Sequence, residues 1–204
     1  MSEKKFQKTR EIEEKYDQTA EHYETRYNSI QELKYSRVFK DLNEFKNDKR
    51  IDFQFPLILD AGCGTGLLLT YLDECKPFED FVYVGMDISL NMLGIAIKKG
   101  KKNCKGNFLH ATVDHVPFRN GMFDFVASIT TLQNLDKHQY LGFFNEIADS
   151  LTKNGISCLS FLEKPPLSNL IEKIINILER LYLRVFFQKW PELEDSAIFC
   201  ENPK

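Results

Sequence analysis

The sequence predicts an α/β fold in which a mostly parallel sheet is covered by helices on both faces. Three observations support this prediction. Apolar, strand-like runs alternate with helical patterns over most of the chain, an alternation that produces parallel sheets wound on both faces. A glycine-rich loop follows the first strand, and an acidic residue ends the second. Both features belong at the carboxyl edge of such a sheet, where ligands bind.

The N-terminal part of the chain is expected to form helices that precede the sheet. Residues 8–27 are charged with a few aromatic and apolar residues on one face, and residues 29–46 carry apolar residues at helical spacing. The sheet is complete without these helices. We therefore expect residues 1–50 to form a helical lid or extension on a ligand-binding domain of residues 51–204.

The most informative segment is the apolar strand Leu57–Leu59 together with the loop that follows it. The strand leads into Asp60, and glycine then occupies every second position, at Gly62, Gly64 and Gly66. Glycine lets the backbone approach a ligand closely, because no Cβ atom is in the way and positive φ is available. The spacing G-x-G-x-G differs from the dinucleotide fingerprint G-x-G-x-x-G. No Lys-Ser/Thr pair follows, so the loop is not a phosphate-binding P-loop either.

A second apolar strand, Phe81–Met86, is followed by Asp87. A carboxylate at this position can accept hydrogen bonds from both hydroxyls of a ribose. Ser89 is a suitable N-cap for the helix that runs from there to Lys99. These residues predict that the second strand contributes to a nucleoside-binding site.

The remaining elements continue the alternation of strands and helices to the end of the chain. In order, the sequence predicts the strand Phe123–Ile129, the helix Asp136–Lys153, the strand Gly155–Leu162, the helix Leu170–Leu181, and the strands Tyr182–Gln188 and Ser196–Glu201. In the first of these helices, the residues expected to face inward are Tyr140, Leu141, Phe144, Ile147 and Leu151.

The glycine loop with its preceding acid resembles the first motif of class I S-adenosylmethionine-dependent methyltransferases, D-x-G-x-G-x-G. Residues 85–93 are similar to the second motif, G-x-D-x-S-x-x-M-L, and residues 111–126 are similar to D-A-x-x-L-P-F followed by x-F-D-x-V. Residues 16–23 are similar to the Y-D-x-x-A-x-x-Y opening of type 11 and ubiquinone-biosynthesis-like methyltransferases. The resemblance covers roughly residues 16–201.

The resemblance implies a Rossmann-like sheet of seven strands with the last strand antiparallel, and an enzyme that uses S-adenosyl-L-methionine. In the family, tyrosines such as Tyr16 and Tyr23 close over the methionine end of the cofactor. Thr112 stands where an adenine-binding Asp is usual, and Asp114 can take over that contact. The cofactor-binding residues implied by the resemblance are Tyr16, Tyr23, Asp60, Ala61, Gly62, Cys63, Gly64, Gly66, Asp87, Ile88, Met92, Thr112, Val113 and Asp114.

The sequence assigns no catalytic residue with certainty, and methyl transfer does not require a catalytic triad. It depends on positioning and desolvation, and only sometimes on a base. The loop after the fourth strand lacks the N-P-P-Y of amino-methylating enzymes and the cysteine of cytosine C5 enzymes. Three candidates follow from position: His115 near the cofactor crevice, Asn134 in that loop, and Glu163 at the end of the fifth strand. Asn134 either orients the substrate or only caps the next turn.

Charge and cysteine content bear on the partners and the cellular location of the protein. The 204 residues carry a net charge of −3, so no overall basic field attracts nucleic acid. The five cysteines are scattered without C-x-x-C spacing, which predicts a reducing, cytoplasmic location and no metal site. The polar N-terminus does not resemble a signal peptide, and no apolar run approaches the ~20 residues that span a bilayer.

The sequence leaves the chemical class of the methyl acceptor open. A small molecule or lipid precursor is favoured by the N-terminal motif and by the net charge. The alternative is an RNA or a translation factor, modified with the help of a small activator protein, and the lysine-rich residues 98–105 favour it. A non-catalytic cofactor-binding fold is the third reading. The departure at Thr112 favours it, whereas the retained Asp60, glycine loop and Asp87 oppose it.

Overall fold

The computed structural model describes residues 3–47, 53–103, 106–165, 167–182 and 184–202. Within these residues, seven strands form one sheet of order β3-β2-β1-β4-β5-β7-β6. The strands are β1 Leu57–Ala61, β2 Val82–Asp87, β3 Gly106–His110, β4 Phe123–Ser128, β5 Leu151–Leu162, β6 Arg184–Trp190 and β7 Asp195–Glu201. The pairs among β1 to β5 are parallel, and β7 is antiparallel to both β5 and β6. The predicted fold class, including the antiparallel last strand, is confirmed.

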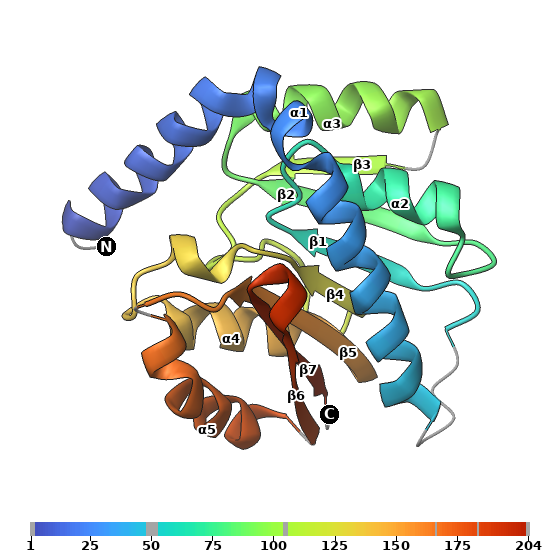
Figure 1. Ribbon diagram of the computed structural model, residues 1–204, viewed down its shortest axis with the longest axis vertical. Coiled ribbons are helices and arrows are strands. Elements are labelled where there is room, and N and C mark those ends of the chain that lie inside the picture. Colours follow the sequence, from blue (N-terminus) through green and yellow to red (C-terminus); the bar gives the residue numbers. More distant parts are fainter. Residues whose placement is uncertain (1–2, 48–52, 104–105, 166, 183, 203–204) are drawn as a thin grey trace.

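Helices cover both faces of the sheet (Figure 1). They are α1 Glu3–Asn47, α2 Leu67–Cys75, α3 Leu90–Asn103, α4 Tyr140–Ser150 and α5 Ile171–Leu181, with short 3-10 turns η1 Leu132–Asn134, η2 Leu167–Leu170 and η3 Pro191–Leu193. Successive strand residues point to opposite faces. Ile58 therefore packs with α1 and α2, and Leu59 packs with α4 and α5. None of the described helices has both the length and the apolar content needed to cross a membrane.

The N-terminal segment is one continuous helix rather than the two helical stretches predicted at 8–27 and 29–46. The Asn28 side chain donates a hydrogen bond to the Glu32 carboxylate at 2.8 Å, one helical turn away, across the expected break. Figure 1 shows that α1 changes direction where it passes α3. The helix thus has a first half near the carboxyl edge of the sheet and a second half beside the sheet itself.

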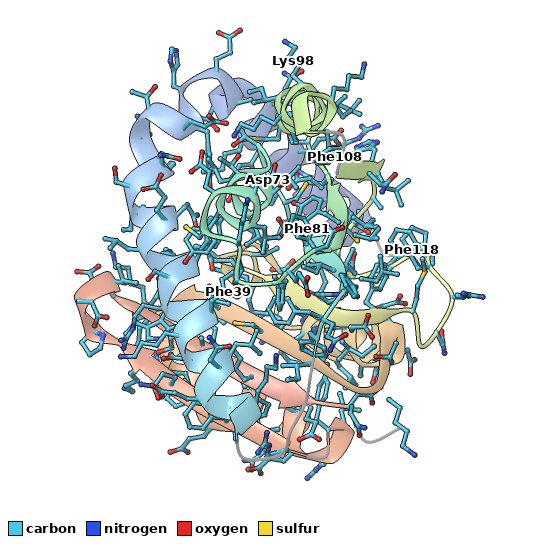
Figure 2. All side chains as sticks on the ribbon, turned by 90° about the vertical axis from the view of Figure 1, so that its right-hand side faces the viewer. Phe39, Asp73, Phe81, Lys98, Phe108 and Phe118 are labelled. Atoms are coloured by element: carbon cyan, nitrogen blue, oxygen red, sulfur yellow. The ribbon has the colours of Figure 1, made fainter. Side chains whose placement is uncertain are left out.

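The second half of α1 belongs to the hydrophobic core. Val38 and Leu42 are each 1% exposed and pack with residues of α2 and the sheet. Phe39 lies on the inner side of the helix (Figure 2), and its ring stacks on Tyr71 with a centroid distance of 5.6 Å. We therefore confine the lid proposal to the first half of α1.

Two buried polar contacts tie this second half to the antiparallel end of the sheet. The Lys34 ammonium lies 2.7 Å from a carboxylate oxygen of Asp195 on β7, and both side chains are almost fully buried. The indole N–H of Trp190 on β6 donates to the Asp41 carboxylate at 2.7 Å. Such contacts fix the position of the helix, because each buried polar group needs its partner.

Helix α4 is shorter than the sequence predicts, and one residue faces the other way. It spans Tyr140–Ser150, because residues 136–139 form a turn and β5 already begins at Leu151. Leu141 was expected to face inward but is 54% exposed. Consecutive residues of a helix are about 100° apart. The buried face of α4 is set by Tyr140, Phe143, Phe144 and Ile147, and Leu141 lies outside it.

Candidate functional site

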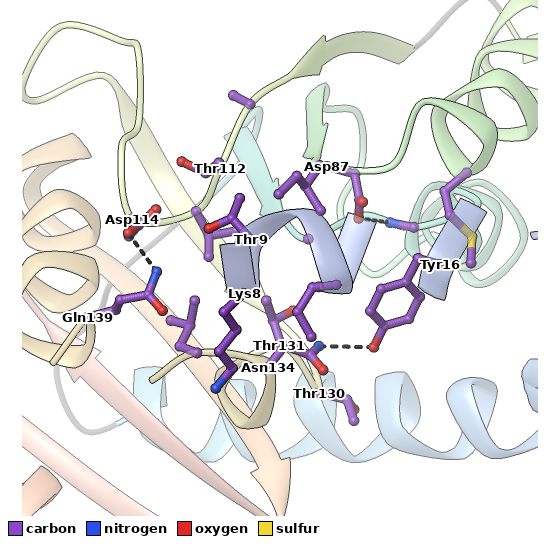
Figure 3. A pocket seen from close by; sticks show the side chains of 18 of the residues that line it. Lys8, Thr9, Tyr16, Asp87, Thr112, Asp114, Thr130, Thr131, Asn134 and Gln139 are labelled. Carbon is purple, nitrogen blue, oxygen red and sulfur yellow. Dashed lines mark hydrogen bonds between the residues drawn. The ribbon is translucent and has the colours of Figure 1, made fainter. Parts of the chain in front are cut away.

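A cavity lies at the carboxyl edge of the sheet, between the ends of β1, β2 and β4 and the first half of α1 (Figure 3). Most of the predicted cofactor residues meet there. Those that line it are Tyr16, Tyr23, Gly62, Gly64, Asp87, Ile88, Met92, Thr112, Val113 and Asp114. The predicted residues that do not line it are Asp60, Ala61, Cys63 and Gly66. These four lie in or next to the glycine loop and act on its shape.

The glycine loop leaves room for a ligand at one position and fits tightly at another. Gly64 has φ +53°, and a Cβ added there would meet no atom within 4 Å. Gly62 has φ +92°, and a Cβ there would lie 2.4 Å from the hydroxyl oxygen of Thr131. Gly62 is therefore required by the packing of the protein. The space above Gly64 is open to a bound molecule.

Asp87 connects the loop to the second strand and faces the cavity. One carboxylate oxygen accepts a hydrogen bond from the Gly64 N–H at 2.8 Å, and the other accepts from the Ser89 N–H at 2.9 Å. Burial raises the pKa of Asp87, and these backbone hydrogen bonds lower it. A carboxylate accepts about four hydrogen bonds, and backbone N–H groups of Gly64, Ser89 and Ile88 act on this one. It keeps room to accept from a ribose hydroxyl in the cavity.

Asp60 lies beneath the loop, outside the cavity. Its carboxylate accepts a hydrogen bond from the Tyr83 hydroxyl at 2.6 Å. Burial raises the pKa of Asp60 to about 7, and the Tyr83 hydrogen bond only partly opposes this. The acid of the first motif is thus bonded to Tyr83 on β2 and is absent from the lining of the cavity.

The Asp60 site should make the stability of the protein depend on pH. The folded-state pKa lies above the ordinary value of an aspartate, so the folded state holds the proton more tightly than the unfolded chain does. The contribution of Asp60 to the free energy of unfolding is complete below about pH 4 and is lost as pH rises toward about 7. Between about pH 5 and pH 8 the wild type should lose more stability than Asp60→Asn. Urea midpoints at both pH values measure this, and equal losses in the two proteins would contradict it.

Two tyrosines of α1, Tyr16 and Tyr23, line the cavity. The Asn134 amide donates to the Tyr16 hydroxyl at 2.9 Å (Figure 3), and the Gln31 amide donates to the Tyr23 hydroxyl at 3.4 Å. Burial raises the pKa of Tyr23 to about 12, so its hydroxyl stays protonated. The Tyr16–Asn134 hydrogen bond joins the first half of α1 to the loop after β4.

Of the three candidates for catalysis, only Asn134 lines the cavity. The His115 side chain is 81% exposed and lies 3.9 Å from Glu146. The backbone N–H of His115 bonds to the Thr112 carbonyl, in a turn that carries the ring away from the cavity. Glu163 accepts from the Lys189 ammonium at 2.6 Å instead. The structure does not bring His115 or Glu163 to the cofactor cavity.

Sequence reasoning missed several residues that line the cavity. The first turns of α1 contribute Lys8, Thr9 and Ile12, and the region after β4 contributes Ile129, Thr130, Thr131, Leu135 and Gln139. Thr130 has φ +59°, a conformation that its sequence does not signal. The Gln139 amide donates to the Asp114 carboxylate at 2.8 Å, which holds that predicted residue in place.

A second, larger cavity of about 880 Å³ adjoins the first. Three residues line both cavities: Lys8, Leu135 and Gln139. The rest of its wall comes from the segment between η1 and α4 and from the segment that follows β5. The two cavities are therefore neighbours that share part of their wall.

The chain matches known proteins in sequence. Residues 58–155 match the family described as "Methyltransferase domain". The chain is 34% identical to an uncharacterized protein of Methanocaldococcus jannaschii, over 63% of this chain and 48% of that one. It is 30% identical to an 18S rRNA (guanine-N(7))-methyltransferase of Schizosaccharomyces pombe (66% and 54%). It is 32% identical to a malonyl-[acyl-carrier protein] O-methyltransferase of Legionella pneumophila (76% and 50%). The chain spans about half the length of these relatives.

Solved structures share the fold at low sequence identity. Magnesium protoporphyrin IX methyltransferase from Synechocystis, solved with bound S-adenosylhomocysteine, superimposes with a TM-score of 0.70 at 16% identity, covering 96% of this chain and 99% of that one. A SAM-dependent methyltransferase from Aquifex aeolicus gives a TM-score of 0.65 at 16% identity, covering 92% and 97%. Residues 58–155 thus match a methyltransferase domain, and the chain shares its fold with solved S-adenosylmethionine-dependent methyltransferases.

Proposed function

We propose that this protein transfers the methyl group of S-adenosylmethionine to a small organic acceptor. The observation that carries the acceptor class is the second cavity, which adjoins the cofactor cavity and shares Lys8, Leu135 and Gln139 with it. Cavities of roughly 300–1,000 Å³ suit small molecules. The relative from Legionella is named for a malonyl group on an acyl carrier protein, which is an organic acceptor group rather than a nucleobase.

The residues of the first cavity fit the cofactor. Asp87 offers two oxygens to a ribose, the space above Gly64 is open, and Thr112 and Asp114 offer oxygens to an adenine amine. When bound, the cofactor supplies an electrophilic methyl group and leaves as the neutral thioether. The chain's own part is to hold the two reactants in line and to exclude water. Tyr16 and Asn134 close the α1 side of the cavity for this purpose.

A labelling experiment tests the proposed function. The protein is incubated with S-adenosylmethionine labelled with tritium in the methyl group and with fractionated cell extract, with or without nuclease. We expect label in the low-molecular-mass organic fraction, and nuclease should not change it. Label confined to nuclease-sensitive material would contradict a small-molecule acceptor.

The rRNA methyltransferase relative from Schizosaccharomyces pombe favours RNA as a second candidate acceptor. In that case a small activator protein would supply the RNA affinity that a chain of net charge −3 lacks. RNA binding that weakens steeply with salt would support this candidate.

The cysteines support a cytoplasmic location. In the described part of the chain, four of them are free thiols: Cys63, Cys75, Cys158 and Cys200.

Gly64→Ala should weaken the cofactor without unfolding the protein. The added Cβ meets no protein atom within 4 Å, although the positive φ adds strain of about 1–2 kcal/mol. A bound cofactor would meet this Cβ. We expect affinity for S-adenosylhomocysteine to fall at least tenfold, or by about 1.4 kcal/mol, when measured by calorimetry.

Gly94→Ala in α3 is the matched control, because its Cβ also meets nothing within 4 Å and lies away from the cavity. Affinity should not change in this variant. Equal affinities in both variants would show that the cofactor does not occupy the space above Gly64.

The first half of α1 is proposed to act as a lid. With α1 in place the cofactor cavity measures only about 90 Å³, below the roughly 300 Å³ of common ligand pockets. A shift of the helix would enlarge the cavity for the cofactor, and its return would close the site. We expect amides of residues 5–20 to become more protected from hydrogen exchange when S-adenosylhomocysteine is added. Amides of residues 35–45, in the core, provide the internal control. Unchanged protection of residues 5–20 would mean that this half is fixed.

A further inference from the structure

We infer that the acceptor is an amphiphilic anion, with an apolar body held in the second cavity and one anionic group at its mouth. This inference rests on the proposed function and specifies its acceptor. It follows from three observations: where the two cavities meet, what lines the second one, and how its charges are paired.

The junction of the cavities defines where the methyl-accepting end must lie. Leu135 and Gln139 line both cavities, and Lys8 of α1 spans them from the other side. An acceptor in the second cavity comes nearest to a cofactor at these three residues. Its reactive atom therefore points inward, and the opposite end of the molecule points toward the mouth.

The apolar part of the second cavity is formed by leucines. Their side chains come from two separate segments, with Leu135 after β4 and Leu162, Leu167 and Leu170 around the end of β5. Leu167 is only 2% exposed. A wall of this kind binds hydrocarbon by removing it from water. The polar lining residues, apart from Lys8 and Lys164, lie together in residues 133–140.

The charges of the cavity leave one lysine uncompensated. The Lys8 ammonium lies 2.5 Å from Asp136, and the Lys164 ammonium lies 2.7 Å from Glu194. Lys137 lines the same cavity, and among the described residues it has no carboxylate as an ion-pair partner. Its side chain is exposed, which places its charge toward solvent. An acceptor whose carboxylate or other anionic group reaches Lys137 would complete the pairing.

Binding of simple amphiphiles tests the inference. The full chain is saturated with S-adenosylhomocysteine and titrated by calorimetry with decanoate, decan-1-ol and guanosine monophosphate. Decanoate should bind at least tenfold more tightly than decan-1-ol. Lys137→Glu should remove this preference and leave decan-1-ol binding unchanged. Lys153→Glu makes the same charge change on an exposed lysine at the other end of β5, and it should have no effect.

A second variant tests the apolar body. Leu170→Trp adds bulk to the cavity and should weaken decanoate and decan-1-ol alike, while affinity for S-adenosylhomocysteine stays the same. If decanoate shows no preference, if Lys137→Glu and Lys153→Glu behave alike, or if guanosine monophosphate binds most tightly, the inference is overturned. If S-adenosylhomocysteine itself does not bind to the wild type, the proposed function fails instead.

Discussion

Lys34→Met should lower the free energy of unfolding by about 3–5 kcal/mol. The substitution leaves the Asp195 carboxylate buried without its partner, because the Lys34 ammonium lies 2.7 Å away and both side chains are nearly inaccessible to water. Burial already raises the pKa of Asp195, and Lys34 opposes that rise. The same ammonium donates to the Thr130 hydroxyl at 2.9 Å. Urea unfolding followed by circular dichroism measures the loss.

Lys40→Met is the matched control on the same helix, because Lys40 is exposed. A surface change of this kind should stay within about 0.5 kcal/mol. Adding Asp195→Asn to Lys34→Met should recover part of the loss, since the unpaired charge is then gone. Equal losses in Lys34→Met and Lys40→Met would show that the buried ion pair does not contribute specifically to the free energy of unfolding.

Asp87→Ala should weaken S-adenosylmethionine and S-adenosylhomocysteine alike, by about 2–3 kcal/mol or roughly 30–150-fold. Both ligands carry the ribose that the carboxylate is proposed to hold. The substitution also frees the Gly64 and Ser89 N–H groups, which now bond to the two carboxylate oxygens at 2.8 and 2.9 Å. Calorimetric titration of each ligand gives the two affinities.

Asp73→Ala on α2 removes a carboxylate that does not line the cofactor cavity. It should leave both affinities unchanged. An Asp87→Ala protein that loses only one of the two ligands would show that the carboxylate does not act through the shared ribose. Comparable losses in Asp73→Ala would point to a general effect of charge.

The parts of the site that the sequence predicts are those encoded within short segments. The alternation of Gly62 and Gly64 and the acid at the end of β2 specify a backbone shape and a carboxylate without reference to the rest of the chain. The Ser89 cap is equally local, and the structure shows its hydroxyl accepting from the Met92 N–H at 3.1 Å. The mostly parallel sheet with helices on both faces follows from the alternation of strands and helices.

The parts that the sequence does not predict depend on contacts between distant segments. Asn28 lies between the two predicted helical stretches and is a weak helix former. Its bond to Glu32 and the packing of the second half of α1 keep the helix continuous. Thr130 takes its positive φ beside Lys34, which lies 96 positions earlier in the sequence. No local pattern places Lys8 against Asp136, so the junction of the two cavities could not be foreseen.

The continuity of α1 has a mechanical consequence. Lys8 precedes Tyr23 by 15 residues, a distance of about 22 Å along a helix that rises about 1.5 Å per residue. If this segment moves as a rigid helix, a tilt of about 10° at Tyr23 displaces Lys8 by about 4 Å. Because Lys8 lies at the wall common to both cavities, one small tilt changes the access of both reactants together. The entry of the cofactor and the entry of the acceptor would then depend on one movement of the first half of α1.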